Sequence, residues 1–236
     1  MIYITGDTHR EFNRLIGLDI KKNDMLIILG DACINYYLNK EDERLKRYLN
    51  SFKYKFFIVR GNHEERPENI STYKEVEMFG GKVYMESAFK NLIFAKDGEV
   101  YNIDDKKVLV LGGAYSVDKY YRILYRYEWF KDEQLNENEK KNILEKVEGK
   151  HFDVVLSHTS PLKYEATEAF VLNIDQSTVD KSMEEFLDKV EESIDYDKWY
   201  CGHYHIEKQI DKMEFMFEST KEFCKDKVLV RKRRFF

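Results

Sequence analysis

Residues 25–31 read Met-Leu-Ile-Ile-Leu-Gly-Asp, an apolar run that passes directly into a glycine and an acidic residue. Such a run, with no polar alternation, is typical of a strand that is buried on both faces. Similar short runs rich in Val, Ile and aromatic residues predict further buried strands at residues 2–4, 56–59, 92–95, 108–111, 154–156 and 199–201. The pattern predicts a sheet whose strands end in short polar loops.

Apolar residues at helical spacing lie between several of these strands. They predict helices near residues 45–52, 135–147 and 179–194. Because the order is strand, helix, strand and the strands are apolar on both faces, we expect helices packed on a largely parallel sheet.

The middle and the end of the chain add antiparallel features. Residues 82–114 place strand-like segments close together, with short polar turns at 96–99 and 104–107. These turns predict antiparallel hairpins, and therefore a mixed sheet. Residues 206–217 and 228–230 are expected to form closing strands.

Length and composition restrict the classes to which the protein can belong. A chain of 236 residues fits one large α/β domain, so we expect a single domain over residues 1–236. Hydrophobic residues make up 43% and the chain holds 17 Tyr and 16 Phe, which is enough for a core and excludes disorder. A net charge of −5 gives no global positive field for nucleic acid or membrane, and the basic residues 231–234 are interpreted as a solvated strand end.

The cysteines and the apolar runs indicate the compartment. Three cysteines at wide spacing, with no CxxC, argue against a disulfide framework and favour the reducing cytoplasm. No basic segment followed by a long apolar run opens the chain, and no run approaches the ~20 residues that span a bilayer. We therefore expect a cytoplasmic protein with no membrane partner.

The histidines carry the chemical signal. Five of the six follow an apolar strand run and stand beside Gly, Asp, Asn or Ser, namely His9, His63, His158, His203 and His205. Loops at the carboxyl ends of parallel strands converge on one crevice, so these side chains are expected to meet. Neutral imidazole and carboxylate oxygen suit Zn, Mn and Fe. The sequence therefore predicts a hydrolytic metal centre.

At these motifs the chain resembles the calcineurin-like metallophosphoesterase superfamily, whose ordered signature is D-x-H, GD, GNH[D/E], H and GH-x-H. All five blocks are present in order, at residues 7–9, 30–31, 61–64, 158 and 202–205. Any one block is weak, but five in order are specific, and the resemblance spans residues 5–205. It implies a four-layer α/β sandwich of two mixed β-sheets flanked by helices, with the metals at one edge.

The resemblance implies two divalent metal ions. Asp7, His9 and His205 would hold the first ion, Asn62, His158 and His203 the second, and Asp31 would bridge them. Mn, Fe, Zn, Ni and Co are all compatible with such N and O ligands, and Mn is favoured. The family pattern further implies in-line attack on phosphorus by a hydroxide that bridges the metals.

His63 and Asp31 are the expected catalytic residues. By the resemblance, His63 does not bind metal but donates a proton to the leaving oxygen or stabilises the charge that builds there. Many relatives orient this histidine with a second aspartate in GD-x-x-D, whereas Ile34 stands at that position here. The residue that orients His63 is left open between Asn35 and Glu64.

Something else must hold the phosphate. The candidates are Arg10, Asn35, Tyr115, Lys119 and Arg122. The last three belong to residues 112–122, a segment similar to one in bacterial and phage-type members of the superfamily. Arginine suits phosphoryl oxygens, and tyrosine can stack on a base or hydrogen-bond a phosphate. The alternative is an aromatic surface loop with solvated charges.

Three functions are weighed. The leading hypothesis is a metal-dependent phosphoesterase that hydrolyses a phosphomonoester on a small molecule or a phosphoprotein. The second is a phosphodiesterase or nuclease acting on nucleotides, with nucleic acid as a partner only as substrate. The third, a non-catalytic metal-binding scaffold, is disfavoured because all seven ligand positions and His63 are filled. The sequence does not indicate an oligomeric state.

Overall fold

A computed structural model describes residues 1–172 and 174–230. Its α-helices are α1 (Lys40–Asn50), α2 (Lys119–Tyr125), α3 (Glu137–Val147) and α4 (Ser182–Ser193). Its strands are β1 (Ile2–Thr5), β2 (Met25–Leu29), β3 (Lys55–Val59), β4 (Tyr73–Met78), β5 (Gly81–Glu86), β6 (Leu92–Ala95), β7 (Val100–Ile103), β8 (Lys106–Leu111), β9 (His151–Ser157), β10 (Asp195–Cys201), β11 (Lys208–Ile210), β12 (Met213–Phe215) and β13 (Thr220–Glu222). Short 3₁₀ helices occupy Phe12–Leu15, Pro67–Asn69, Leu162–Tyr164, Thr167–Ala169 and Gln176–Thr178.

The strands form two mixed sheets. The first has the order β13-β1-β2-β3-β6-β5-β4, and its central strands β1, β2, β3 and β6 run parallel. The second has the order β11-β12-β10-β9-β8-β7, with β8, β9, β10 and β12 parallel. Antiparallel strands complete the edges of both. The expectation of an α/β fold with two mixed sheets is confirmed.

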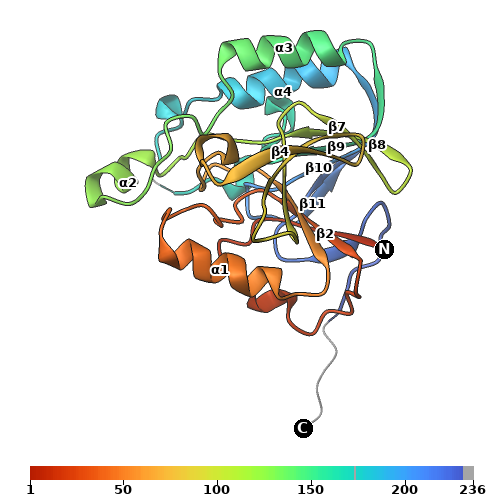
Figure 1. The fold of residues 1–236 in the computed structure, drawn as a ribbon. Coiled ribbons are helices and arrows are strands. Elements are labelled where there is room, and N and C mark those ends of the chain that lie inside the picture. Colours follow the sequence, from red (N-terminus) through yellow and green to blue (C-terminus); the bar gives the residue numbers. More distant parts are fainter. Residues whose placement is uncertain (173, 231–236) are drawn as a thin grey trace.

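The layers follow from three apolar clusters. One cluster lies between the sheets, one joins the second sheet to α3 and α4, and one joins the first sheet to α1. Figure 1 shows the resulting order, with α1 on one side of the paired sheets and α3 and α4 on the other. The four-layer sandwich implied by the family resemblance is therefore present.

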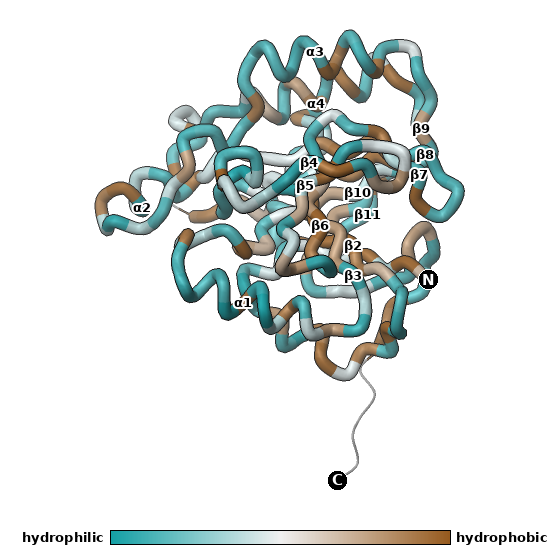
Figure 2. The backbone as a smooth tube through the Cα atoms, viewed as in Figure 1, coloured by the Kyte–Doolittle hydropathy of each residue, from teal (hydrophilic) through white to brown (hydrophobic). Residues whose placement is uncertain are grey.

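Strand β2 is apolar at every position because both of its faces are buried. Ile27 and Leu29 face the cluster between the sheets, whereas Leu26 and Ile28 face the cluster beneath α1. Because successive side chains point to opposite faces, a strand with both faces covered needs an apolar residue at every position. Figure 2 shows these brown central strands, with polar residues on the outer turns of α1 and α3.

All seven strand predictions fall inside observed strands, and the three predicted helices correspond to α1, α3 and α4. The hairpin turn predicted at 104–107 joins β7 and β8, as expected. The prediction of a second hairpin at 96–99 is wrong, because β6 and β7 lie in different sheets. Both edges of β6 are already paired, with β3 and β5, so the chain crosses to the other sheet instead.

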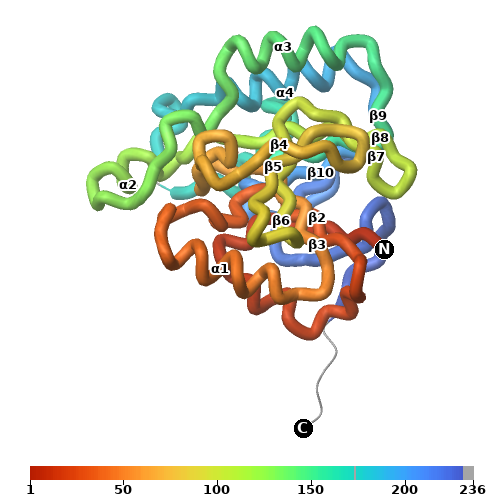
Figure 3. The backbone as a smooth tube through the Cα atoms, in the orientation of Figure 1, coloured from red at the N-terminus to blue at the C-terminus, as the bar shows by residue number. Residues whose placement is uncertain are grey.

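The C-terminal part closes the first sheet differently from the prediction. Residues 206–217 contain the expected strands β11 and β12, but β13 pairs with β1, and Val228 makes only an isolated bridge to Lys221. Figure 3 shows the resulting proximity of the red N-terminal and blue C-terminal segments. The basic residues 231–234 lie outside the described residues. None of the helices in residues 1–172 and 174–230 has the length and apolar character needed to cross a membrane.

Candidate metal centre

The predicted metal ligands all follow the carboxyl ends of neighbouring parallel strands. Asp7 comes after β1, Asp31 after β2 and Asn62 after β3, while His158 follows β9 and His203 follows β10. Since β1, β2 and β3 are adjacent in one sheet and β9 and β10 in the other, their loops meet at one edge of the sandwich. The fold thus brings together residues that lie almost 200 positions apart.

One cluster forms around Asp7. The Nε2 atoms of His205 and His9 lie 3.3 and 3.8 Å from Asp7 Oδ2, and 2.8 Å from each other. The carboxylate is buried, and its oxygens also accept from the backbone N–H of His203 at 3.0 and 3.1 Å. Two imidazole nitrogens and one carboxylate oxygen therefore converge on one point.

Asp31 lies between this cluster and a second one. Its carboxylate oxygens lie 3.8 Å from His9 Nε2, 3.6 Å from His63 Nε2 and 3.5 Å from His158 Nε2. The backbone N–H of His63 donates to Asp31 Oδ1 at 2.9 Å. Asp31 is therefore the group that both clusters share.

The second cluster contains the remaining predicted ligands. Asn62 Oδ1 lies 2.8 Å from His158 Nε2, and the His203 ring packs against the His158 ring with centroids 5.0 Å apart. Among the described His, Cys, Asp and Glu residues, several groups of three bring their ligand atoms within 4.8 Å of one another. His203 belongs to none of these groups, whereas His63, which was not expected to bind metal, belongs to one with His9 and Asp31.

Four of the predicted metal ligands have a strained backbone conformation. Non-glycine residues rarely adopt positive φ, yet His9, Asp31, His203 and His205 have φ of 43°, 45°, 67° and 51°. Two neighbouring glycines are needed for space rather than for a turn. A Cβ on Gly61 would lie 2.0 Å from Asp31 Oδ1, and a Cβ on Gly202 would lie 2.1 Å from Asp7 Oδ1. The glycines thus allow the carboxylates to approach the backbone closely.

The imidazoles keep the two buried carboxylates ionised. Burial is the largest effect on each and raises its pKa, but the histidines around them reverse this, so the pKa of Asp7 is lowered and that of Asp31 is lowered well below its usual value. Burial lowers the pKa of His203 to about 3, with His158 adding to the effect. Burial also lowers the pKa of His158, but Asp31 overcomes it and raises the value to about 9.

The donor set fits divalent cations. His158 Nδ1 lies 2.8 Å from the carbonyl oxygen of Leu29, which can only accept, so Nδ1 carries a proton. Nε2 is then the ring nitrogen that faces Asn62 and Asp31, and a cation that displaces its proton would find His158 oriented as a metal-ligating histidine held by a backbone carbonyl is. Two buried carboxylates with converging imidazoles form an N/O site suited to Mn, Fe, Zn, Ni or Co.

Arg122 on α2 contacts His63. Its Nε donates to both carboxylate oxygens of Asp118 at 2.8 Å, and a terminal nitrogen donates to Tyr36 Oη at 3.2 Å. The other terminal nitrogen lies against His63 Nδ1. A guanidinium has no acceptor, so His63 Nδ1 accepts this hydrogen bond and the neutral ring carries its proton on Nε2, facing Asp31.

Neither residue that the sequence left open as the partner of His63 contacts the His63 ring in the described structure. Asn35 is fully buried, and its Oδ1 accepts from Tyr73 Oη at 3.0 Å. The Glu64 carboxylate is buried and accepts from the backbone N–H of Ile34 at 3.3 Å. Asn35 is therefore also out of reach of a substrate, so the prediction that it binds substrate has no support here.

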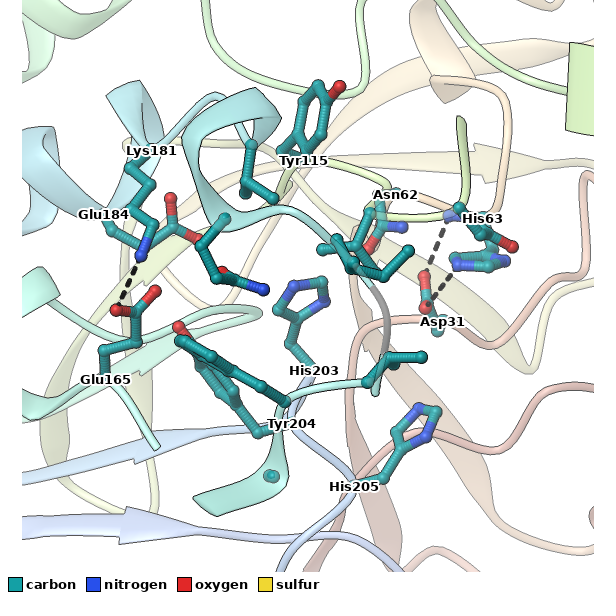
Figure 4. Close-up of a pocket in the computed structure, with 18 of the residues that line it drawn as sticks. Asp31, Asn62, His63, Tyr115, Glu165, Lys181, Glu184, His203, Tyr204 and His205 are labelled. Atoms are coloured by element: carbon teal, nitrogen blue, oxygen red, sulfur yellow. Dashed lines mark hydrogen bonds and ion pairs between the residues drawn. The ribbon is translucent and has the colours of Figure 1, made fainter. Parts of the chain in front are cut away.

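The other residues predicted to bind substrate differ in whether they line the cavity at the metal centre. Arg10 is committed to Asp42, 2.7 Å away, and does not line the cavity at the metal centre. The Lys119 ammonium lies 4.2 Å from the centroid of the Trp129 ring. Tyr115 does line the cavity, beside Asn62 and His63 (Figure 4).

The cavity itself was not predicted. It has a volume of about 270 Å³ and extends from the predicted metal ligands to residues 165–171 and 174–181 and the start of α4. Figure 4 shows Glu184, Lys181 and Glu165 at the end opposite Asp31 and His63. Glu184 lies at helical spacing from Leu187, within the apolar face predicted for 179–194. The one feature of the sequence that could have indicated this end of the cavity is an acidic residue on a helix face that is otherwise apolar.

Glu184 predicts a pH-dependent stability. Burial raises its pKa from 4.5 to about 7, so the folded protein holds a proton that the unfolded chain releases at lower pH. Stability from this group is therefore present below about pH 4.5 and is lost as the pH rises through about 7. Glutamine cannot ionise, so the Glu184→Gln variant does not lose this stability as the pH rises. Between pH 4.5 and pH 8 we expect its free energy of unfolding to increase by roughly 2–3 kcal/mol relative to that of the wild type.

Urea unfolding of the metal-free proteins at both pH values measures this gain. Glu185→Gln is the matched control, since it makes the same change at an exposed position of the same helix. Parallel pH profiles for wild type and Glu184→Gln would show that Glu184 is not the group responsible.

Comparison with known proteins agrees with the geometry. The family model described as calcineurin-like phosphoesterase matches residues 1–207. No curated protein sequence is significantly similar to the chain.

Proposed function

Because this chain belongs to the calcineurin-like phosphoesterase family, and is therefore a metal-dependent phosphoric ester hydrolase, we propose that it hydrolyses a phosphomonoester at the edge where its two sheets meet. The observation that carries the proposal is the position of Asp31. This buried carboxylate belongs to two clusters, one with His9 and His63 and one with Asp7 and His158.

Seven residues are proposed to hold two divalent cations. Asp7, His9 and His205 would hold one, Asn62, His158 and His203 would hold the other, and Asp31 would be shared by both. When bound, the cations supply Lewis-acid activation of a water molecule and of the phosphoryl oxygens. Support comes from the ionised, buried carboxylates and from His158 Nε2, which faces the oxygens of Asn62 and Asp31.

The protein's own contribution centres on His63 and Arg122. Asp118 fixes the guanidinium of Arg122, which adds positive charge beside the metal clusters. His63 presents Nε2–H toward the same space, where it can donate to a phosphoryl oxygen. These two groups would stabilise charge that builds on the phosphoryl group.

A second function, hydrolysis of nucleotide phosphodiesters, is favoured by α2. This helix buries none of its residues and projects from the body of the protein (Figure 1). Tyr120, Tyr121, Tyr125 and Tyr127 are each more than half exposed, and the Tyr121 and Tyr127 rings stack with centroids 6.0 Å apart. Exposed aromatic faces are suited to stacking on bases.

Metal removal tests the proposed function. We expect protein reconstituted with Mn²⁺ to hydrolyse p-nitrophenyl phosphate, EDTA treatment to lower the rate by at least about 100-fold, and added Mn²⁺ to restore it. Metal content is followed by mass spectrometry and folding by circular dichroism. An unchanged rate in folded, metal-free protein would contradict the proposal.

Bis-p-nitrophenyl phosphate, assayed on the same preparation, separates the two candidate functions. The monoester is expected to react faster. A faster diester reaction would assign the protein to the phosphodiesterases. No reaction with either ester, with metal bound, would favour the non-catalytic scaffold.

A further inference from the structure

Asn62 differs from the other predicted metal ligands because its side chain is an amide. An amide has an acceptor oxygen at one end and a donor NH₂ group at the other, and only the oxygen can bind a cation. The two ends have nearly the same shape, so packing alone does not distinguish between them. A metal site that uses Asn62 therefore requires a group that fixes which end faces the cation.

Ser116 contacts the donor end of this amide. Asn62 Nδ2 donates to Ser116 Oγ at 2.9 Å, whereas Asn62 Oδ1, at the other end, lies 2.8 Å from His158 Nε2. Asn62 and Ser116 are each only 2% exposed. Ser116 therefore holds the amide from the end opposite to the predicted metal ligand His158.

Glu133 determines which way the Ser116 hydroxyl group points. A hydroxyl group can donate or accept, so Ser116 by itself could pair with either end of the Asn62 amide. Glu133 Oε2 lies 2.5 Å from Ser116 Oγ, and Glu133 Oε1 accepts the backbone N–H of Ser116 at 3.1 Å. An ionised carboxylate only accepts, so the one hydroxyl hydrogen is used on Glu133 and only lone pairs remain for Asn62. The hydroxyl group thus selects the NH₂ end of the amide.

Glu133 is itself held in place by Arg60, at the end of the first sheet. The buried guanidinium donates to the backbone carbonyl of Glu133 at 2.6 Å and to Asp97 Oδ2 at 2.9 Å. The backbone carbonyl of Arg60 accepts the N–H of Gly113 at 2.8 Å. Gly113 has a φ of 92°, and a Cβ there would lie 2.4 Å from the carbonyl oxygen of Glu133. This packing fixes the position of Ser116 relative to the strand that precedes Asn62.

The segment that carries Ser116 also orients the residue after Asn62. Ser116 lies just before α2, and Arg122 on that helix contacts His63 Nδ1. Asn62 and His63, which are consecutive in the loop after β3, are therefore both held by residues 116–122.

From these contacts we propose that Ser116 and Glu133 are positioning residues, which hold the carbonyl oxygen of Asn62 toward a cation shared with His158. The hydrogen bond between Asn62 and His158 cannot do this when the cation is bound, because Oδ1 and Nε2 then both face the cation. The contacts at the opposite end of the amide remain to fix its direction. The inference rests on the proposed function in taking Asn62 as a ligand of the second cation.

Binding of Mn²⁺ to the full chain tests this inference. Metal-free wild-type protein and the Ser116→Ala variant are titrated with Mn²⁺ by isothermal titration calorimetry. We expect the variant to bind the first ion as the wild type does and the second at least about tenfold more weakly, the loss typical of removing a group that orients a metal ligand. Ser177→Ala, which removes an exposed hydroxyl group that donates to Asp175 at 2.8 Å, is the matched control and is expected to bind both ions normally.

Electron paramagnetic resonance provides a second readout on the same samples. Two neighbouring Mn²⁺ ions give a coupled spectrum, whereas separate ions give the spectrum of isolated Mn²⁺. At two equivalents of Mn²⁺ we expect the coupled spectrum in the wild type and mainly the isolated spectrum in Ser116→Ala.

Glu133→Gln separates orientation from packing and provides a second variant where Ser116→Ala does not fold. Glutamine keeps the shape of the side chain but has one acceptor oxygen for the two Ser116 donors. Its NH₂ group would direct the hydroxyl hydrogen toward Asn62, so we expect the second Mn²⁺ to bind at least about tenfold more weakly. Glu137→Gln, at an exposed position of α3, is the control, and circular dichroism follows folding.

The outcomes separate this inference from the proposed function. Wild-type affinity for the second Mn²⁺ in either folded variant overturns the positioning role, even where p-nitrophenyl phosphate is hydrolysed. Selective weakening of the second ion in a protein that hydrolyses no phosphoester supports the role and contradicts the proposed function. A wild type that binds only one Mn²⁺, equal weakening of both ions, or failure of both variants to fold overturns the inference.

Discussion

We expect the Asp31→Asn variant to remain folded and to lose at least about two orders of magnitude in turnover on p-nitrophenyl phosphate. The carboxylate of Asp31 faces His9, His63 and His158 at 3.5–3.8 Å, so both ligand clusters lose the same negative charge. The amide oxygen of asparagine can still accept the backbone N–H of His63. Asparagine also tolerates the left-handed backbone at this position, where φ is 45°.

The matched control is Asp105→Asn. Asp105 has a similar φ of 57°, but it is exposed in the turn between β7 and β8. Its replacement makes the same chemical change on the same backbone conformation, and turnover is expected to stay at the wild-type value. Turnover, bound metal and circular dichroism are measured on both variants. Wild-type turnover in a folded, metal-depleted Asp31→Asn protein would refute the shared role of Asp31.

The strands that could be predicted from the sequence are those covered on both faces. Strand β2 is buried at every position, and its apolar run marks it without further context. Strand β4 was missed because most of its residues face solvent at the edge of the sheet. Helix α2 was missed for a related reason, since it buries no residue and so shows no apolar periodicity.

The gathering of Asp, Asn and His side chains at one edge of the sandwich could be predicted because each stands in a short motif beside a strand end. The side-chain contacts around these motifs could not be predicted, because they depend on distances between elements that are remote in sequence. The contact between Arg122 and His63 joins α2 to the loop after β3, and the hydrogen bond between Thr159 and Glu184 joins the loop after β9 to α4. Arg122 was named as a candidate for phosphate binding, but its contact with His63 was not foreseen.

That contact bears on the two roles left open for His63. Burial lowers the pKa of His63, and Arg122 and His9 lower it further, against the opposing charge of Asp31. A guanidinium at Nδ1 disfavours the imidazolium, while it leaves Nε2–H as a hydrogen-bond donor. The geometry therefore favours stabilisation of charge on the phosphoryl oxygens over proton transfer to the leaving oxygen.

We accordingly expect His63→Ala to lower kcat by about 100-fold, the loss typical of one preorganised donor to a developing oxyanion. The loss is expected to be the same on p-nitrophenyl phosphate and on phenyl phosphate, which has the more basic leaving group. His151→Ala, at an exposed histidine that pairs with Asp195 at 2.9 Å, is the control and is expected to leave kcat unchanged. A general acid matters most when the leaving group is poor, so a much larger loss on phenyl phosphate would establish proton transfer instead.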